Sequence, residues 1–219
     1  MRKLFSDSKA LFSLIFLISA LFMLSCTQNL PEIRYSNMTV IFDYKDNDSL
    51  PDSRLSIFVE SISDVRRYET LNVVNNQNGF SWDVSQLIRI RSAEKMYAGN
   101  TNLKVPSGEM IPTGEYKIVY SNADLEQIES KVNLEYDSVF YETKASDIPD
   151  LMLQKKGIKN ISIYDKSDKM IYYGERNSQL SDNRKIWNKY SNASYFHEIW
   201  ILPDKSVICV MPKQLVVPS

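Results

Sequence analysis

Residues 38–142 alternate between apolar and polar side chains with a period of two, the pattern of strands that bury one face. The first two runs lie at 39–44 and 55–60. Similar runs follow at 70–74, 80–84, 96–105, 115–120 and 131–136. Segments rich in Asn, Asp, Gly and Pro separate the runs and favour turns. About seven short strands at this spacing predict an antiparallel β-sandwich over residues 38–142.

After residue 142 the pattern changes to a mixture of helical and strand-like segments. Asp147 and Pro149 favour the start of a short helix, and Gly157 favours its end. The later elements are a hairpin at 160–173, a helix at about 179–190, and strands at 195–202 and 206–211. Residues 143–219 are therefore predicted to form a small α+β unit of order α-β-β-α-β-β. A unit of this size buries little surface alone, so we expect it to pack against the sandwich.

Residues 10–24 form an uncharged, largely apolar run that follows Arg2, Lys3 and Lys9. Fifteen residues is the length of the hydrophobic region of a signal peptide and is short for a membrane-spanning helix. The run ends at Ser25-Cys26. This ending resembles the lipobox of bacterial lipoproteins.

The lipobox resemblance implies cleavage before Cys26 and acylation of its thiol by diacylglycerol or palmitate-type chains, which would anchor the chain firmly in a bilayer. Residues 1–25 would then be a lipoprotein signal peptide and residues 26–37 a lipidated tether. The alternatives are an uncleaved transmembrane anchor, and ordinary secretion with a coincidental cysteine.

The segment Ile111–Tyr120 places a proline and a glycine just before a strand led by Tyr116. It resembles the entry to the penultimate strand of immunoglobulin-like and fibronectin type III-like domains. The resemblance covers roughly residues 38–137 and implies a sandwich of that kind. The chain lacks the Cys-Trp-Cys pattern of antibody domains, so we interpret Trp82 as a core residue.

Composition and charge narrow the range of functions. The formal net charge is −1 and no basic cluster stands out, which argues against a nucleic-acid partner. With 43% hydrophobic residues and only six glycines, the chain is globular rather than a low-complexity stalk. Attachment to a membrane would depend on the lipid.

The residues that usually carry chemistry are few. Cys209 lies in an apolar run and, with Cys26 acylated, has no partner, so it is predicted to be a buried free thiol. His197 is the only histidine, and no serine lies in a G-x-S-x-G turn. A zinc site of His197, Glu198 and Cys209 is disfavoured because adjacent strand residues point to opposite faces. We predict no catalytic residue, no metal and no cofactor.

Aromatic residues concentrate in the second unit, and the candidate partner-binding residues are Tyr172, Tyr195, Phe196 and Trp200. Tyr and Trp are enriched at recognition surfaces. The alternative is that these rings pack against the sandwich.

We therefore expect a lipoprotein of the cell envelope, held on the inner or outer membrane and facing the periplasm or the surface, with a protein partner there. In composition and layout the chain resembles uncharacterised envelope lipoproteins of spirochaete-like and other diderm bacteria. The expected function is a non-catalytic binding or assembly module. The alternatives are a carbohydrate- or peptidoglycan-binding lipoprotein and a hydrolase with an unrecognised site.

Overall fold

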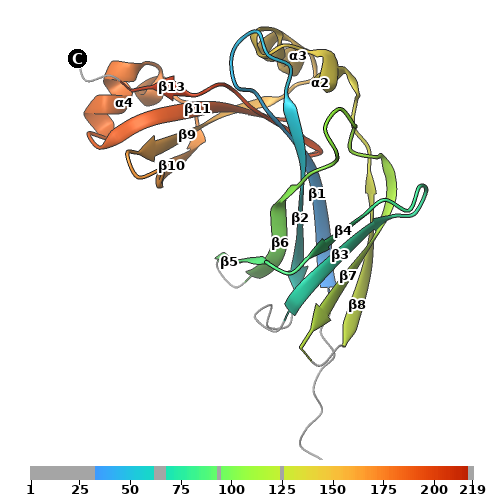
Figure 1. The fold of residues 1–219 in the computed structure, drawn as a ribbon. Coiled ribbons are helices and arrows are strands. Elements are labelled where there is room, and N and C mark those ends of the chain that lie inside the picture. The colour runs from blue at the N-terminus through green and yellow to red at the C-terminus, as the bar shows by residue number, and fades with distance from the viewer. Residues whose placement is uncertain (1–32, 62–67, 93–94, 124–125, 217–219) are drawn as a thin grey trace, which may run out of the picture. The chain divides into compact units, whose positions relative to one another are not determined.

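A computed structural model describes residues 33–61, 68–92, 95–123 and 126–216. The predicted signal peptide and Cys26 lie outside these residues. The described fold is mainly β and contains two sheets that pack as a sandwich (Figure 1). The prediction of a mainly β chain is confirmed.

The larger sheet has nine strands, in the order β10-β9-β11-β12-β1-β2-β6-β5, with β13 also paired to β11. These strands are β1 (Ile33–Asp43), β2 (Asp52–Ser61), β5 (Ile88–Ser92), β6 (Lys95–Leu103), β9 (Ile158–Asp165), β10 (Met170–Glu175), β11 (Ala193–Ile201), β12 (Val207–Val210) and β13 (Gln214–Leu215). All of its pairings are antiparallel except β1 with β12, which is parallel.

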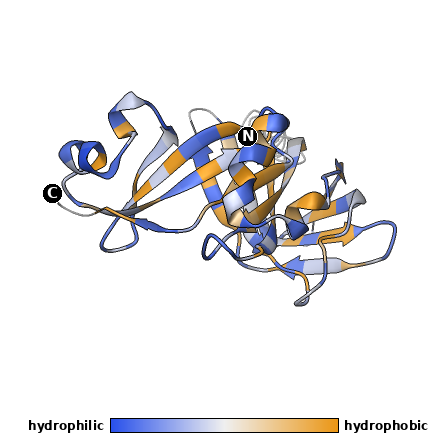
Figure 2. Cartoon of the chain, turned by 90° about the horizontal axis from the view of Figure 1, so that it is seen from above, coloured by the Kyte–Doolittle hydropathy of each residue, from blue (hydrophilic) through white to orange (hydrophobic). Residues whose placement is uncertain are grey.

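The smaller sheet has four antiparallel strands in the order β4-β3-β7-β8. They are β3 (Tyr68–Asn75), β4 (Ser81–Val84), β7 (Gly114–Asn122) and β8 (Gln127–Leu134). Figure 1 shows this sheet packed across from β1, β2 and β6. The core between the sheets contains Val40, Leu55, Leu71, Ile118 and Tyr120, all fully buried. The alternation that predicts the strands is visible along them in Figure 2.

Three α-helices and two 3-10 helices complete the described fold. The α-helices are α2 (Val139–Glu142), α3 (Ile148–Gln154) and α4 (Asn183–Lys189), and the 3-10 helices are η2 (Ala145–Asp147) and η3 (Ser178–Leu180). The predicted helix after Asp147 is present as α3. Pro149 lies in its first turn, and Met152 is one of its buried residues. The second predicted helix begins later than expected, because Asp182 caps α4 by accepting a hydrogen bond from the Lys185 N–H at 3.0 Å.

The segment 143–219 follows the predicted order of elements, with β13 added, but its strands do not form a sheet of their own. β12 pairs in parallel with β1, where Val207 lies opposite Val40, and β11 and β9 extend the same sheet. Residues 32–219 accordingly form one compact unit. We expected two packed units; the structure joins them because the open edge of β1 takes β12 as a strand neighbour.

β1 begins at Ile33, inside the segment predicted to be a tether up to residue 37. Four of the five added residues pair with the end of β2, for example Asn37 opposite Phe58. Backbone hydrogen bonding to a long neighbour extends the strand where the apolar pattern gives no signal.

The strand directions define two ends of the sandwich. The chain enters the described fold at Ile33, and β1 runs from there to Asp43. We call the end at Asp43 the distal end. β3 and β8 also finish at this end, at Asn75 and Leu134, and β7 begins there at Gly114.

Candidate functional site

The distal end is formed by the loops after β1, β3 and β6 and by the segment after β8. The longest of these loops, residues 104–113, joins β6 to β7. Its first part is a tight turn in which the Glu109 N–H donates to the Pro106 carbonyl at 3.1 Å. Gly108 occupies the turn position that requires a positive φ, here 86°. Glu109 and Met110 are thereby held outward, and 55% of Met110 is exposed.

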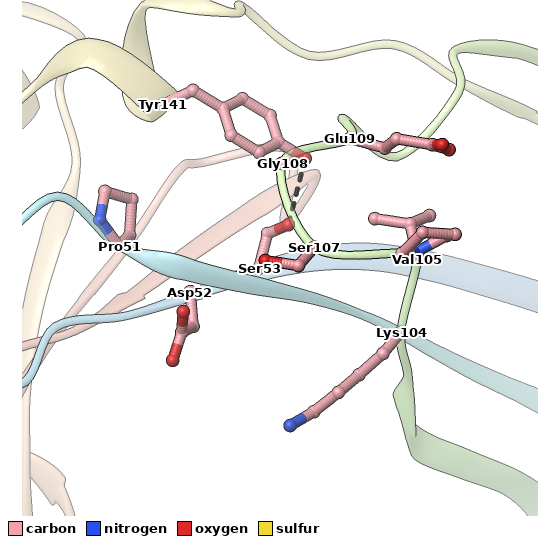
Figure 3. Close-up of a pocket in the computed structure, with 10 residues that line it drawn as sticks. Pro51, Asp52, Ser53, Lys104, Val105, Ser107, Gly108, Glu109 and Tyr141 are labelled. Carbon is pink, nitrogen blue, oxygen red and sulfur yellow. Dashed lines mark hydrogen bonds between the residues drawn. The ribbon is translucent and has the colours of Figure 1, made fainter.

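Two tyrosines fix the second part of this loop. The buried Ile111 donates its N–H to the Tyr141 hydroxyl at 2.9 Å, and its carbonyl accepts a hydrogen bond from the Tyr136 hydroxyl at 2.5 Å. The Tyr141 hydroxyl in turn donates to Ser53 Oγ at 3.1 Å, as Figure 3 shows. Both polar backbone groups of a buried residue are satisfied by side chains distant in sequence, which keeps the loop in one conformation.

The first cavity of the distal end lies between this loop and the start of β2 and has a volume of about 300 Å³. Figure 3 shows its lining, which includes Asp52, Ser53, Lys104, Ser107, Glu109 and Tyr141. Charges of both signs surround it. The hydrogen bond from Lys45 keeps the pKa of Asp52 below its usual value, so this carboxylate is ionised at neutral pH.

The second cavity lies on the other side of the loop and has a volume of about 680 Å³, within the range of small-molecule sites. Glu109 lines both cavities. The remaining lining residues of the second cavity are Gln77, Asn78, Phe80, Met110, Ile111, Pro112, Thr113, Tyr136 and Ser138. None of these described residues is a lysine, an arginine or a histidine.

Asn75 joins the two walls of the larger cavity. Its side chain is fully buried and donates to the Thr113 carbonyl at 3.0 Å. Its Oδ1 accepts the N–H groups of Gln77 at 2.9 Å and Asn78 at 3.2 Å. One amide thus ties the β3–β4 turn to the loop before β7.

A row of aromatic rings extends from the lining of the larger cavity into the core. Phe80, half-buried, meets Trp82 edge to face at 4.7 Å between ring centroids, and Trp82 stacks on Tyr116 at 6.2 Å. Trp82 Nε1 donates to the Lys104 carbonyl at 2.7 Å, and the Tyr116 hydroxyl donates to the Pro112 carbonyl at 2.5 Å. Burial raises the pKa of Tyr116 to about 12, so its hydroxyl stays protonated.

The aromatic residues predicted to bind a partner do not form an exposed patch. Tyr195, Phe196 and Trp200 are buried, and Tyr172 is half-buried. Tyr195 stacks on Tyr164 at 4.9 Å between centroids and donates its hydroxyl to Asp168 at 2.9 Å. Alternation along β11 sends Trp200 into the main core, and Phe196 packs in the core beneath α4. The alternative weighed from the sequence, packing against the sandwich, describes Trp200 alone, since Phe196, Tyr172 and Tyr195 pack within the segment 143–219.

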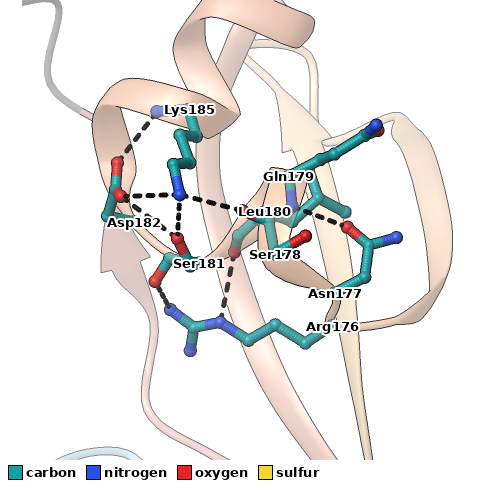
Figure 4. Close-up of polar contacts among 8 residues, drawn as sticks. All are labelled: Arg176, Asn177, Ser178, Gln179, Leu180, Ser181, Asp182 and Lys185. Atoms are coloured by element: carbon teal, nitrogen blue, oxygen red, sulfur yellow. Dashed lines mark hydrogen bonds and ion pairs between the residues drawn. The ribbon is translucent and has the colours of Figure 1, made fainter.

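A charged cluster next to these rings holds the 176–185 segment in place (Figure 4). Arg176 donates to the carbonyls of Leu180 at 3.2 Å and Ser181 at 2.7 Å and pairs with Glu198. Lys159 Nζ lies 2.8 Å from the same Glu198 carboxylate. The cluster satisfies partly buried charges and backbone carbonyls, which is a structural role.

His197 and Cys209 are not brought together. The register pairs Trp200 with Cys209, so Cys209 faces the core while His197 points to the opposite face of the sheet. His197 Nδ1 hydrogen-bonds the Met211 carbonyl at 2.7 Å. Cys209 is a buried free thiol, as predicted. Within the described ranges no group of three or more potential ligands is placed to hold a metal ion.

The sequence does not predict a binding site at the distal end. The turn at 75–79 was recognisable from its Asn and Gly content, and Tyr136 from its place at the end of a strand run. Nothing local in the sequence marks Tyr141 as their neighbour, because its contacts to Ser53 and Ile111 span 88 and 30 residues.

Comparison with known proteins gives no relative: no family model, no curated protein and no solved structure matches this chain. In the part of the chain that the structure describes, every helix is too short or too polar to cross a membrane.

Proposed function

We propose that the protein is a lipid-anchored lipoprotein of the cell envelope that works as a non-catalytic binding module and holds its ligand at the distal end. The observation that carries this proposal is the position of the two cavities. Both lie at the end of the sandwich opposite Ile33, where the chain enters the described fold.

The proposed lipidation site would be joined to the sandwich by a short connection. Residues 27–32 lie between the proposed lipidation site Cys26 and Ile33, and a stretch this short reaches at most about 25 Å. The eleven residues of β1 add roughly 33 Å between Ile33 and the distal end. The tether would keep Ile33 within about 25 Å of the lipidated cysteine, and the cavities lie at the other end of β1.

The loop arrangement supports binding by a preformed site. The hydrogen bonds of Tyr136, Tyr141 and Asn75 fix the cavity walls before any ligand arrives, which reduces the entropy cost of association. The proposal includes an immunoglobulin- or fibronectin type III-like sandwich, supported by the Tyr116–Pro112 hydrogen bond at the start of β7. Such domains commonly bind through loops at one end.

The anchor is tested by mass spectrometry of the chain purified from membranes. We expect a mature N-terminus at Cys26 that carries acyl groups. A chain that retains Arg2, or an unmodified Cys26, would contradict lipidation.

The binding site is tested with two tryptophan substitutions in the full-length, membrane-inserted protein. Glu109→Trp places a bulky ring where both cavities meet, and Glu69→Trp places the same ring at an exposed position on β3 near the other end. Components that co-purify from native envelopes are identified by protein mass spectrometry and glycan composition analysis. We expect Glu109→Trp to lose a component that Glu69→Trp retains; equal retention by both variants would contradict a distal site.

A further inference from the structure

We infer that the larger distal cavity binds a neutral saccharide. This inference rests on the proposed function and names the class of ligand for one of its two cavities. It follows from the charge, the unused hydrogen-bonding groups and the apolar lining of that cavity.

The charge of the lining disfavours anionic ligands. Phosphates and carboxylates are normally bound by Arg, Lys or backbone N–H clusters. No described residue around the larger cavity carries a positive charge, and the one ionisable acid that lines it is Glu109. A phosphate group would face a carboxylate with no cation to offset the repulsion. A ligand without negative charge fits this lining.

The polar groups of the lining are available to a ligand. The side chains of Gln77, Thr113 and Ser138 make no hydrogen bond with any other described residue, although all three line the cavity. Amides and hydroxyls both donate and accept hydrogen bonds. Sugar hydroxyls have the same dual character, so each can be matched by such a group, whereas a purely apolar ligand would leave them unpaired.

Part of the lining is apolar. Phe80, Met110 and Pro112 contribute it, and Phe80 is held by Trp82 and by the hydrogen bond from its own N–H to Asn78 Oδ1 at 3.0 Å. An aromatic ring has a negative face that attracts the weakly positive C–H groups of a pyranose ring. Apolar side chains next to amide and hydroxyl groups suit a pyranose ring, which is apolar on its faces and polar around its edge.

Trp82 provides a direct reporter of binding, since its ring contacts Phe80. The full-length protein in detergent micelles is labelled with 5-fluorotryptophan, and Trp82→Phe assigns its signal among the three tryptophans. The probes are maltotriose and N,N′-diacetylchitobiose as neutral saccharides, with sialyllactose and inorganic phosphate as anions. We expect the Trp82 resonance to shift in a saturable way with at least one neutral saccharide and with neither anion.

Substitutions then locate the site. Phe80→Ala is expected to raise the dissociation constant about tenfold or more, whereas Phe80→Tyr keeps it within about threefold. Thr113→Val removes a hydroxyl from an exposed side chain, so it tests the polar lining and leaves the aromatic side chains unchanged. It replaces Phe80→Ala if that variant fails to fold. Glu69→Ala is the matched control and leaves the dissociation constant unchanged.

The outcomes separate this inference from the proposed function. If no neutral saccharide shifts the Trp82 resonance, or if the shift persists unchanged in both Phe80→Ala and Thr113→Val, the saccharide assignment is wrong. Loss of an envelope component in Glu109→Trp would still support a distal site in that case, and the mass spectrometry and glycan analysis would identify its chemical class. If a neutral saccharide binds, it should also displace the component captured at the distal end.

Discussion

Ile111 and Tyr141 are joined by a hydrogen bond from the Ile111 N–H to the Tyr141 hydroxyl, 2.9 Å long and spanning 30 residues of sequence. Ile111 is buried, so its N–H cannot turn to water if this partner is lost. The bond therefore couples the loop between the two cavities to α2, the helix that carries Tyr141.

Tyr141→Phe should lower the free energy of unfolding by about 1–3 kcal/mol, because it strands the Ile111 N–H and also removes the contact with Ser53. Urea denaturation of the full chain measures the change. Tyr173→Phe is the control: Tyr173 is exposed and, among the described residues, its hydroxyl accepts from Asn160 alone, so its loss should cost less than about 0.5 kcal/mol. Equal costs for the two variants would contradict a special role for Tyr141.

Asn75→Ala is expected to cost at least as much, about 2–4 kcal/mol, since one buried amide serves the carbonyl of Thr113 and the N–H groups of Gln77 and Asn78. The neighbouring Asn76→Ala changes an exposed side chain that donates one hydrogen bond, to Glu115, among the described residues and should be nearly neutral. Amide hydrogen exchange at Gln77 and Asn78 provides the local readout. Slow exchange at both sites in Asn75→Ala would show that other groups hold the turn.

The sequence predicts the strands of the sandwich well, because apolar and polar side chains alternate along them. β7 buries alternate residues, although β1 is buried throughout 38–42. The runs at 39–44 and 115–120 correspond to β1 and β7. β5 is missed because all five of its residues are exposed, which leaves no buried face to produce a pattern.

Strand neighbours and the site are harder to predict for a different reason. The parallel pairing of Val40 with Val207 joins residues far apart in the chain, and no local signal favours β12 over another neighbour for the edge of β1. That pairing turns the predicted second unit into an extension of the sheet and buries Trp200, which the sequence left as either surface or core. The distal cavities likewise depend on which loops meet at one end of the sandwich.

Glu198→Gln should destabilise the fold by about 2 kcal/mol. Glu198 is 15% exposed and lies between Arg176 and Lys159, and burial lowers the pKa of both cations. Removing the carboxylate leaves two partly buried positive charges facing each other. The cost should shrink in 1 M salt, which screens this repulsion. Glu129→Gln, which breaks an exposed pair with Lys117, should cost less than about 0.5 kcal/mol; a similar cost for both would contradict this account.

Tyr116 should make the fold sensitive to alkaline pH. Burial raises its pKa to about 12, against about 10 in an unfolded chain, so its contribution to stability is complete below pH 10 and is lost as the pH rises from 10 to 12. Tyr116→Phe also loses the bond to the Pro112 carbonyl and should be less stable at pH 7, yet its stability should fall less steeply above pH 10. Urea midpoints measured from pH 7 to 11.5 test this. A slope above pH 10 as steep as that of the wild type would be the contrary result.

Cys209 should be chemically silent in the folded protein. It is fully buried opposite Trp200 and Phe42, and burial raises its pKa to about 12, so little reactive thiolate forms at pH 8. Iodoacetamide should label it only after denaturation, as measured by peptide mass spectrometry at position 209. Ser107→Cys places a thiol on the exposed turn of the distal loop and should react under the same native conditions.

Because the thiol of Cys209 titrates near pH 8.5 in the unfolded chain, the stability that depends on a neutral Cys209 should be lost between about pH 8.5 and 12. Cys209→Ser should lower stability by about 1–3 kcal/mol, since it places a hydroxyl in an apolar site. Labelling of native Cys209 as fast as that of the introduced Cys at position 107 would mean that β12 opens readily and that its pairing with β1 does not hold the sheet together.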